Sequence, residues 1–166
     1  MALSSCGTND VVEEALDKYS NLVRKICFMY LHNYQDVEDV FQEVFLKLLQ
    51  SNTAFESEEH RKAWICKVTI NKCKDLYKSF WRRNVESIED KEIPFEDSYE
   101  SEVMNAVLSL PLKYKDAIFL FYYEGYTVKE ISKLLNQKEN TIYSNLHRAR
   151  ELLKQKLGGA YDEYTI

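Results

Sequence analysis

One stripe of side chains along residues 61–83 has the composition of a surface that binds single-stranded nucleic acid. Its six members recur at alternating intervals of three and four, which places them on one face of a helix: Trp64, Lys67, Asn71, Lys74, Lys78 and Trp81. Ammonium groups pair with backbone phosphates, whereas indole planes stack on unpaired bases and an amide bonds their edges. The stripe predicts contact with single-stranded or partly melted DNA. The alternative is a solvated lysine face whose two tryptophans anchor the core.

A second polar surface follows in residues 127–150, which predict a helix-turn-helix. Apolar residues recur at helical spacing up to Leu135 and again from Ile142, and Asn136 between them tolerates the left-handed conformation that ends helices. Such a motif places its second helix in the DNA major groove. Side chains that suit phosphates and base edges lie there: Lys138, Thr141, Tyr143, Ser144, Asn145, His147, Arg148 and Arg150. The alternative is an ordinary helical hairpin with a solvated face.

Amphipathic helices are expected to position these surfaces. The apolar spacing predicts a helix over 11–30 and another over 37–50, with Asp36 as its N-cap. Residues 51–60 read as a polar loop, in which Phe55 either tucks into the core or presents its ring to a ligand. The helix over 61–83 has its own predicted buried seam: Ala63, Cys66, Ile70, Cys73, Tyr77 and Phe80.

The second half of the chain continues the helical pattern. A helix is predicted over 103–110, and another follows Pro111 and ends near Gly125, before the helix-turn-helix. The chain has only two prolines and four glycines in 166 residues. We therefore expect an all-α protein.

Charge divides the chain into segments of opposite sign. Residues 61–83 hold eight basic residues and one acidic residue, whereas residues 84–102 hold eight acidic residues and one lysine. The acidic segment has no sustained period and contains Pro94, so it reads as a flexible linker extended by self-repulsion. The predicted organisation is two small helical domains, residues 1–83 and 103–166, joined by the acidic linker 84–102. Although the formal net charge is −5, both domains carry a basic segment.

The sequence offers little for other kinds of site. The four cysteines form no CxxC pair, and Cys66 and Cys73 share one helix face, which is a packing pattern, so we expect no metal. A Gly-rich phosphate loop and a nucleophile–base pair are missing, which predicts a protein that is not an enzyme and has no cofactor. The first ten residues do not resemble a signal peptide, and no run of about 18 apolar residues occurs. We expect a reduced, cytosolic protein.

Three stretches of the chain together resemble a known family. They are DVEDVFQEVFLKLLQ (36–50), AWICKVTINKCKDLYKS (63–79) and LPLKYKDAIFLFYYEGYTVKEISKLLNQKENTIYSNLHRAR (110–150). In this order they resemble an RNA polymerase sigma factor of the small, two-domain, extracytoplasmic-function (ECF) type in the sigma-70 family. The resemblance covers about residues 11–157. It implies a transcription initiation factor that binds core RNA polymerase, recognises two promoter elements and assists promoter melting.

The resemblance assigns roles to the first two surfaces. The helix over 36–50 is implied to dock on the beta-prime clamp coiled coil of core polymerase, whose beta subunit is a further partner. The docking positions are Glu38, Asp39, Gln42, Glu43, Leu46 and Lys47. Leu46 stands among acids on the outer face, where a protein contact or a singly exposed leucine would explain it. The helix over 63–83 is implied to melt the minus-ten element, with Asn71 and Phe55 at positions that hold a flipped base.

The helix-turn-helix is implied to bind the minus-thirty-five element as duplex DNA. Tyr143, Ser144, Asn145, His147 and Arg148 match its DNA-facing positions. The family commonly has basic residues where Tyr143 and Asn145 stand, so the sequence of the upstream element stays open. The resemblance further implies an anti-sigma protein as a partner, often membrane-linked, and a free monomer or a one-to-one complex. The alternative class is a regulator that binds duplex DNA through residues 127–150 and uses residues 1–83 for dimerisation or sensing.

Overall fold

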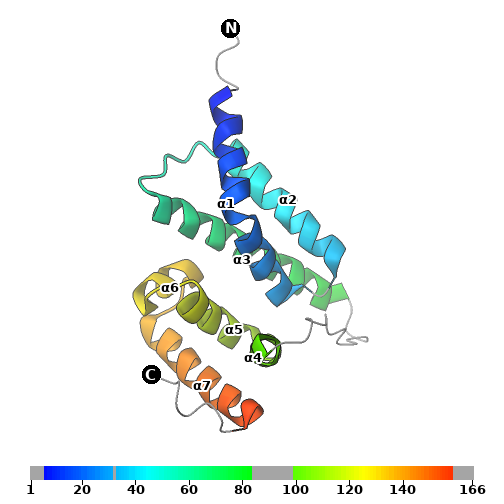
Figure 1. Cartoon of the computed structure of the whole chain (residues 1–166), viewed down its shortest axis with the longest axis vertical. Helices are drawn as coiled ribbons and strands as arrows, with labels where there is room; N and C mark the ends of the chain where they lie inside the picture. The colour runs from blue at the N-terminus through cyan, green and yellow to red at the C-terminus, as the bar shows by residue number, and fades with distance from the viewer. Residues whose placement is uncertain (1–5, 32, 84–98, 159–166) are drawn as a thin grey trace. The chain divides into compact units, whose positions relative to one another are not determined.

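The segments with helical spacing of apolar residues form helices in the described part of the chain. In this computed structural model the described residues are 6–31, 33–83 and 99–158. The regular elements within them are all helical, and the chain divides into two compact units, Met1–Glu92 and Ile93–Ile166 (Figure 1). The prediction of an all-α protein with two small helical domains is therefore confirmed.

Some predicted features lie outside the described residues. They are residues 1–5, residue 32 between the first two predicted helices, residues 84–98 of the acidic linker, the side chain of Trp81, and residues 159–166 at the end of the predicted second domain. The other members of the predicted binding surfaces all fall within the described ranges.

Residues 6–83, apart from position 32, form three helices that each contact the other two (Figure 1). They are α1 (Cys6–Tyr30), α2 (Tyr34–Gln50) and α3 (Glu58–Arg83). Each helix turns one apolar stripe inward, and burial of these stripes is the main favourable contribution to the stability of the unit. The largest fully buried side chains include Ile26, Tyr30, Ile65 and Ile70.

Two thiols connect α1 to α3 inside this core. Cys73 Sγ lies 3.8 Å from Cys27 Sγ, and both side chains are fully buried. The hydrogen bond to Cys27 and the loss of hydration raise the pKa of the Cys73 thiol, because the thiolate is poorly solvated there. Cys66 is buried as well, in agreement with the packing role that the sequence predicts for Cys66 and Cys73.

The start of α2 differs from the prediction. Asn33, not Asp36, is the N-cap: its backbone is extended, and its side-chain oxygen accepts a hydrogen bond from the Asp36 backbone N–H at 3.1 Å. The helix therefore begins at Tyr34, and Asp36 lies in its first turn, where a negative charge favours the positive end of the helix dipole.

The third helix begins earlier than predicted, and one member of its predicted seam is exposed. α3 starts at Glu58, three residues before the expected Arg61. Cys66, Ile70 and Cys73 are buried as predicted, but Phe80 is 49% exposed. The prediction that Phe80 is buried is wrong, because helical spacing within α3 does not determine how far neighbouring helices cover the stripe.

Residues 99–158 form the helices of the C-terminal unit. They are α4 (Tyr99–Leu108), α5 (Leu112–Ile118), the π-helical turn η1 (Phe119–Tyr123), α6 (Val128–Leu135) and α7 (Glu139–Leu157). α4 starts four residues before the expected position, and α7 contacts α4, α5 and α6. In η1 the Glu124 N–H bonds the Phe119 carbonyl at 3.1 Å, a wider turn than in an α-helix. Gly125 follows with φ +72°, which agrees with the predicted end of the helix.

Local signals at both ends of α6 build the helix-turn-helix. Thr127 and Glu130 form a capping box, in which each side chain accepts a hydrogen bond from the other residue's backbone N–H. Asn136 ends the helix in the left-handed conformation with φ 52°, as predicted. The second helix then packs its apolar face on α5 and α6 through Ile142, Leu146 and Ala149.

A carboxyl group is buried in the C-terminal unit. Asp116 of α5 is almost inaccessible to water, and this desolvation raises its pKa to about 8. The group is therefore mainly protonated at neutral pH, because burial disfavours its charged form.

Candidate nucleic-acid interface

The predicted stripe on α3 lies at the surface of the N-terminal unit. Lys67, Asn71 and Lys78 are exposed, while Trp64 and Lys74 are half-buried. Partial burial lowers the pKa of Lys74, and the nearby charge of Lys78 lowers it further. The stripe therefore offers cations and an amide to a ligand, flanked by an indole at its N-terminal end.

The loop before α3 adds a second aromatic ring to that end. Phe55 is half-buried and lies edge-on to Trp64, with 5.7 Å between ring centroids. It also lies edge-on to His60, at 5.6 Å. We call Phe55, His60 and Trp64 the aromatic cluster. Its position beside Lys67 and Asn71 brings base-stacking planes and phosphate-binding groups to one surface.

His60 is a residue of this site that the sequence prediction missed. Its Nδ1 accepts a hydrogen bond from the Glu56 backbone N–H at 3.3 Å, so the neutral ring carries its hydrogen on Nε2. The exposed imidazole can therefore donate to a base edge. A signal was present, because His60 stands four residues before Trp64 and so shares its helix face.

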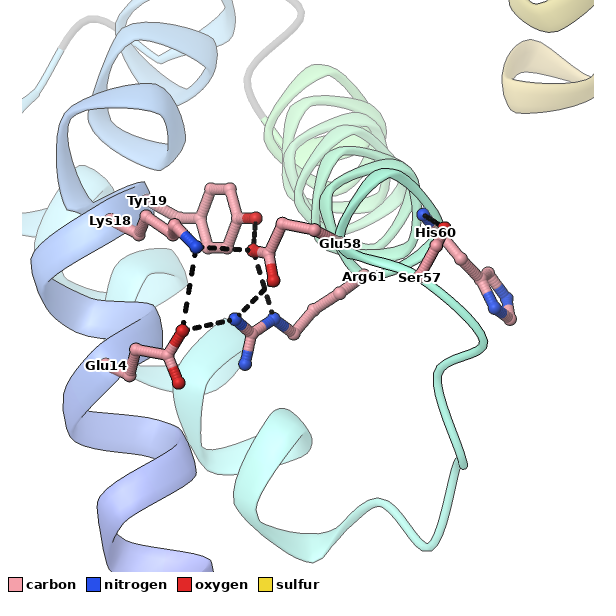
Figure 2. Close-up of polar contacts among 7 residues, drawn as sticks. All are labelled: Glu14, Lys18, Tyr19, Ser57, Glu58, His60 and Arg61. Atoms are coloured by element: carbon pink, nitrogen blue, oxygen red, sulfur yellow. Dashed lines mark hydrogen bonds and ion pairs between the residues drawn. The ribbon is translucent and has the colours of Figure 1, made fainter.

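Charged side chains join the start of α3 to α1 (Figure 2). Arg61 is largely buried, at 7% exposure, and its guanidinium lies 2.7 Å from a Glu58 carboxylate oxygen and 3.0 Å from one of Glu14. Lys18 lies 3.3 Å from Glu58 and 3.6 Å from Glu14. The Tyr19 hydroxyl donates a hydrogen bond to Glu58. We call these five residues the α1–α3 ion-pair cluster.

The ion-pair cluster changes the ionisation of two of its members. The hydrogen bond from Tyr19, followed by those from Arg61 and Lys18, lowers the pKa of Glu58 to about 2. Burial, and then the contact with Glu58, raise the pKa of Tyr19 to about 12. Both groups therefore keep one protonation state over the physiological range, and the contact is constant across it.

The outer face of α7 carries most of the predicted duplex-binding residues. The side chains at the surface are those of Lys138, Thr141, Tyr143, Ser144, His147 and Arg148. Asn145 is a correction, because it is only 8% exposed and stands on the face that Ile142 and Ala149 bury. Its polar character suggested a DNA contact, but its helical position places it in the core.

Arg150 is also engaged by the protein itself. Its Nε donates a hydrogen bond to the Tyr122 hydroxyl at 2.7 Å, and its guanidinium lies 5.9 Å from the Phe121 ring centroid. This contact joins α7 to η1. The arginine is half-buried and acts in the packing of the unit.

The outer face of α2 is exposed at the positions implied to dock on polymerase. Asp39, Gln42 and Lys47 are exposed, and Leu46 is 52% exposed. The other two predicted docking residues, Glu38 and Glu43, form ion pairs with basic residues of the same unit. Glu38 is half-buried and lies 3.2 Å from Arg24, and Glu43 is exposed and lies 2.7 Å from Lys72 of α3.

An apolar groove runs between α1 and this face. Its volume is about 280 Å³, and it is lined by Val12, Leu16, Phe41, Gln42, Phe45, Leu46 and Leu49. Leu46 is thus the exposed edge of a continuous apolar surface and is not an isolated exposed leucine.

Residues 6–31, 33–83 and 99–158 contain no group of three or more His, Cys, Asp or Glu side chains arranged to hold a metal ion. Nor does any of their helices have the length and apolarity that a membrane crossing requires.

Comparison with family models and known proteins identifies both units. The sigma-70 region 2 model matches residues 15–83, and the model "Sigma-70, region 4" matches residues 100–153. The chain is 27% identical over 139 residues to the RNA polymerase sigma factor SigV of Bacillus subtilis. This alignment covers 80% of this chain and 82% of that protein. The chain is 25% identical over 170 residues to the ECF RNA polymerase sigma factor SigW of the same species, with 91% of each covered.

Solved structures show the same fold. One is the sigma factor RpoE in complex with the anti-sigma factor NepR from Bartonella quintana, with a TM-score of 0.73, 19% identity, and coverage of 87% of this chain and 95% of that one. Another is CnrH in complex with the cytosolic domain of CnrY, with a TM-score of 0.65, 16% identity, and coverage of 92% and 90%. The two region models match consecutive units of the chain, and the relatives align along most of their length. The chain is therefore an ECF-type RNA polymerase sigma factor of the sigma-70 family, which is a non-enzymatic transcription initiation factor whose regions 2 and 4 recognise promoter elements.

Proposed function

We propose that the chain binds core RNA polymerase through α2 and opens a promoter by holding an unstacked minus-ten base on α3. Region 2 (residues 1–83) would do both, and region 4 (residues 103–166) would hold the minus-thirty-five element as duplex. The observation that carries the proposal is the exposed stripe of Lys67, Asn71 and Lys78 beside the aromatic cluster. Unstacking a base costs a few kcal/mol, which stacking and hydrogen bonds in the new site offset.

The contact with polymerase is proposed for the outer face of α2. Exposed polar residues, Asp39, Gln42 and Lys47, surround Leu46 and the apolar groove. An apolar centre with a polar rim is the usual composition of a protein interface. Glu38 and Glu43 belong to this face but are paired with Arg24 and Lys72. They would therefore contribute by fixing the orientation of α2 and through the electrostatic potential of the face.

The duplex contact is proposed for the exposed residues of α7. Lys138 and Arg148 would bind phosphates, and Thr141, Tyr143, Ser144 and His147 would reach base edges or sugars. Asn145 is not part of this proposal, since it is buried. The alternative of a regulator with a sensor domain is not supported, because the region 2 model matches the N-terminal unit.

The test is transcription in vitro with core polymerase on a promoter library. The protein should direct initiation from a defined promoter class, and Asn71→Ala should slow promoter opening without weakening core binding. Asn21→Ala is the matched control, because this exposed amide of α1 lies outside the proposed surfaces. Opening at the same rate by the Asn71 and Asn21 variants would refute the role of Asn71.

An anti-sigma protein is proposed as a further partner. The support is a likeness of fold, since the similar RpoE structure was solved in complex with the anti-sigma factor NepR, and the similar CnrH structure was solved in complex with the cytosolic domain of CnrY. We propose that the free protein is a monomer in the cytoplasm and forms a one-to-one complex. Light scattering on the purified chain should give a mass near 19.7 kDa, and a stable dimer would contradict the monomer.

A further inference from the structure

The aromatic cluster lies where an irregular loop meets α3. Phe55 belongs to the loop, and His60 and Trp64 belong to the first turns of the helix. Two hydrogen bonds join the loop to the helix: the Ser57 hydroxyl accepts from the His60 N–H at 3.1 Å, and the Ser57 carbonyl accepts from the Arg61 N–H at 3.1 Å. The orientation of the cluster therefore depends on the orientation of this first turn.

The same turn is attached to α1 by the α1–α3 ion-pair cluster (Figure 2). Arg61 binds the loop through its backbone and binds two carboxylates through its side chain, one of which, Glu14, belongs to α1. An arginine fork fixes direction as well as distance, because its donors are rigid and planar. Tyr19, also of α1, adds a hydrogen bond to Glu58, and its ring lies 5.9 Å from the Arg61 guanidinium.

The arrangement resists rotation of the first turn. Arg61 is 7% exposed, so a rotation that breaks its pairing would leave a largely buried cation without its carboxylates. In Figure 2 the Arg61 and Glu58 side chains point toward α1, whereas the His60 side chain points away from it. One turn of helix thus holds the packing contact on one side and the aromatic cluster on the other.

From this geometry we infer that Arg61, together with Glu58 and Tyr19, positions the aromatic cluster to receive an unstacked promoter base. The inference rests on the proposed function, because it assumes that a base is captured at this site. Arg61 does not contact DNA in this role. It sets the geometry of groups that do, where an error of about 1 Å is enough to lower a rate by roughly a hundredfold.

The test couples these residues to the base. Holoenzyme is assembled from the full chain and core polymerase on a promoter selected from the library. Abasic sites are then placed singly along the non-template strand of the minus-ten element, and the rate of open-complex formation is measured. At one position the wild-type rate should fall roughly tenfold, since stacking on one base accounts for a factor of that order. The ratio of intact to abasic rates does not depend on how much protein is folded.

The variants then separate positioning from stability. Arg61→Met and Tyr19→Phe should open the intact promoter slowly and lose most of the abasic penalty, and Arg61→Lys should retain part of it. Ile26→Val is the matched control, because it weakens the same core away from the loop and should keep the full penalty. Tyr19→Phe removes only a hydroxyl, so it keeps the test valid if Arg61→Met does not fold.

Failure of the inference and failure of the proposed function give different results. A wild-type protein with no abasic penalty at any position would refute base capture, and the inference with it. A penalty that Asn71→Ala abolishes but that Arg61→Met and Tyr19→Phe leave unchanged would overturn the positioning role alone.

Discussion

Tyr143 and Asn145 are two residues apart on α7 and point to opposite sides of it. Tyr143 is 58% exposed, and Asn145 is 8% exposed and lies between Ile142 and Ala149 on the buried face. The family resemblance treats both as DNA-facing positions. The helix separates them because a shift of two residues turns a side chain by about 200°.

The two positions should respond differently to alanine. Asn145→Ala should lower the free energy of unfolding by about 1 kcal/mol, the usual size of a lost packed side chain. Tyr143→Ala should leave stability within about 0.5 kcal/mol and weaken promoter binding by the holoenzyme. Urea unfolding and promoter binding would measure the two effects. A loss of binding without a loss of stability in Asn145→Ala would contradict this assignment.

Leu46 should be a binding residue, as the edge of the apolar groove. Leu46→Asp places a charge in the centre of the proposed interface and should weaken binding to core polymerase roughly tenfold or more, as truncation of a central interface residue does. Tyr34→Ala, at an exposed aromatic of the first turn of the same helix, is the control and should bind normally. Equal affinities of the two variants, measured by fluorescence titration, would place the interface elsewhere.

The buried Asp116 should make the stability of the protein depend on pH. Its folded pKa of about 8 is far above its usual 3.8, so the stability associated with its neutral form is complete below pH 3.8 and is lost as pH rises through 8. Asp116→Asn keeps the shape and removes the proton. Each unit by which folding raises the pKa corresponds to about 1.4 kcal/mol of stability that the wild type loses when the carboxyl ionises. Because the variant has no proton to lose, its unfolding free energy at pH 8.5 should exceed that of the wild type by at least about 1 kcal/mol. A constant difference from pH 5 to 9 would exclude the explanation.

The turn of the helix-turn-helix should tolerate one substitution at Asn136 and not another. Its φ of 52° is a conformation that costs roughly 1–2 kcal/mol for a residue with an ordinary side chain. Asn136→Ala should therefore destabilise the protein by about 1 kcal/mol, whereas Asn136→Gly should be neutral or stabilising. Thermal unfolding of both variants tests this, and equal melting temperatures would argue against strain at the turn.

Local signals made much of the fold predictable from the sequence. Apolar spacing located the helices because each buries one continuous stripe, and Asn136 and Gly125 ended helices where expected. Errors arose where two local signals competed. Asn33 and Asp36 are both residue types that favour the N-cap position. Asn33 is the N-cap of α2 because its side-chain oxygen accepts a hydrogen bond from the Asp36 backbone N–H.

The binding surfaces were predictable in part. Exposed residues on α3 and α7 follow from helical position, and Asn145 was misplaced because its polar type was weighted above its position. The α1–α3 ion-pair cluster could not be predicted, since Arg61 and Glu14 are 47 residues apart in the chain. Such partners meet only through the packing of helices, which spacing within one helix does not encode.

The contact between Cys27 and Cys73 has a practical consequence. Both sulfurs are buried between α1 and α3, and because the pKa of Cys73 is raised, its side chain stays in the unreactive thiol form. An alkylating reagent can modify this pair only after the two helices separate. The rate of its incorporation, followed by mass spectrometry, would therefore measure how often region 2 opens, with no label added to the chain.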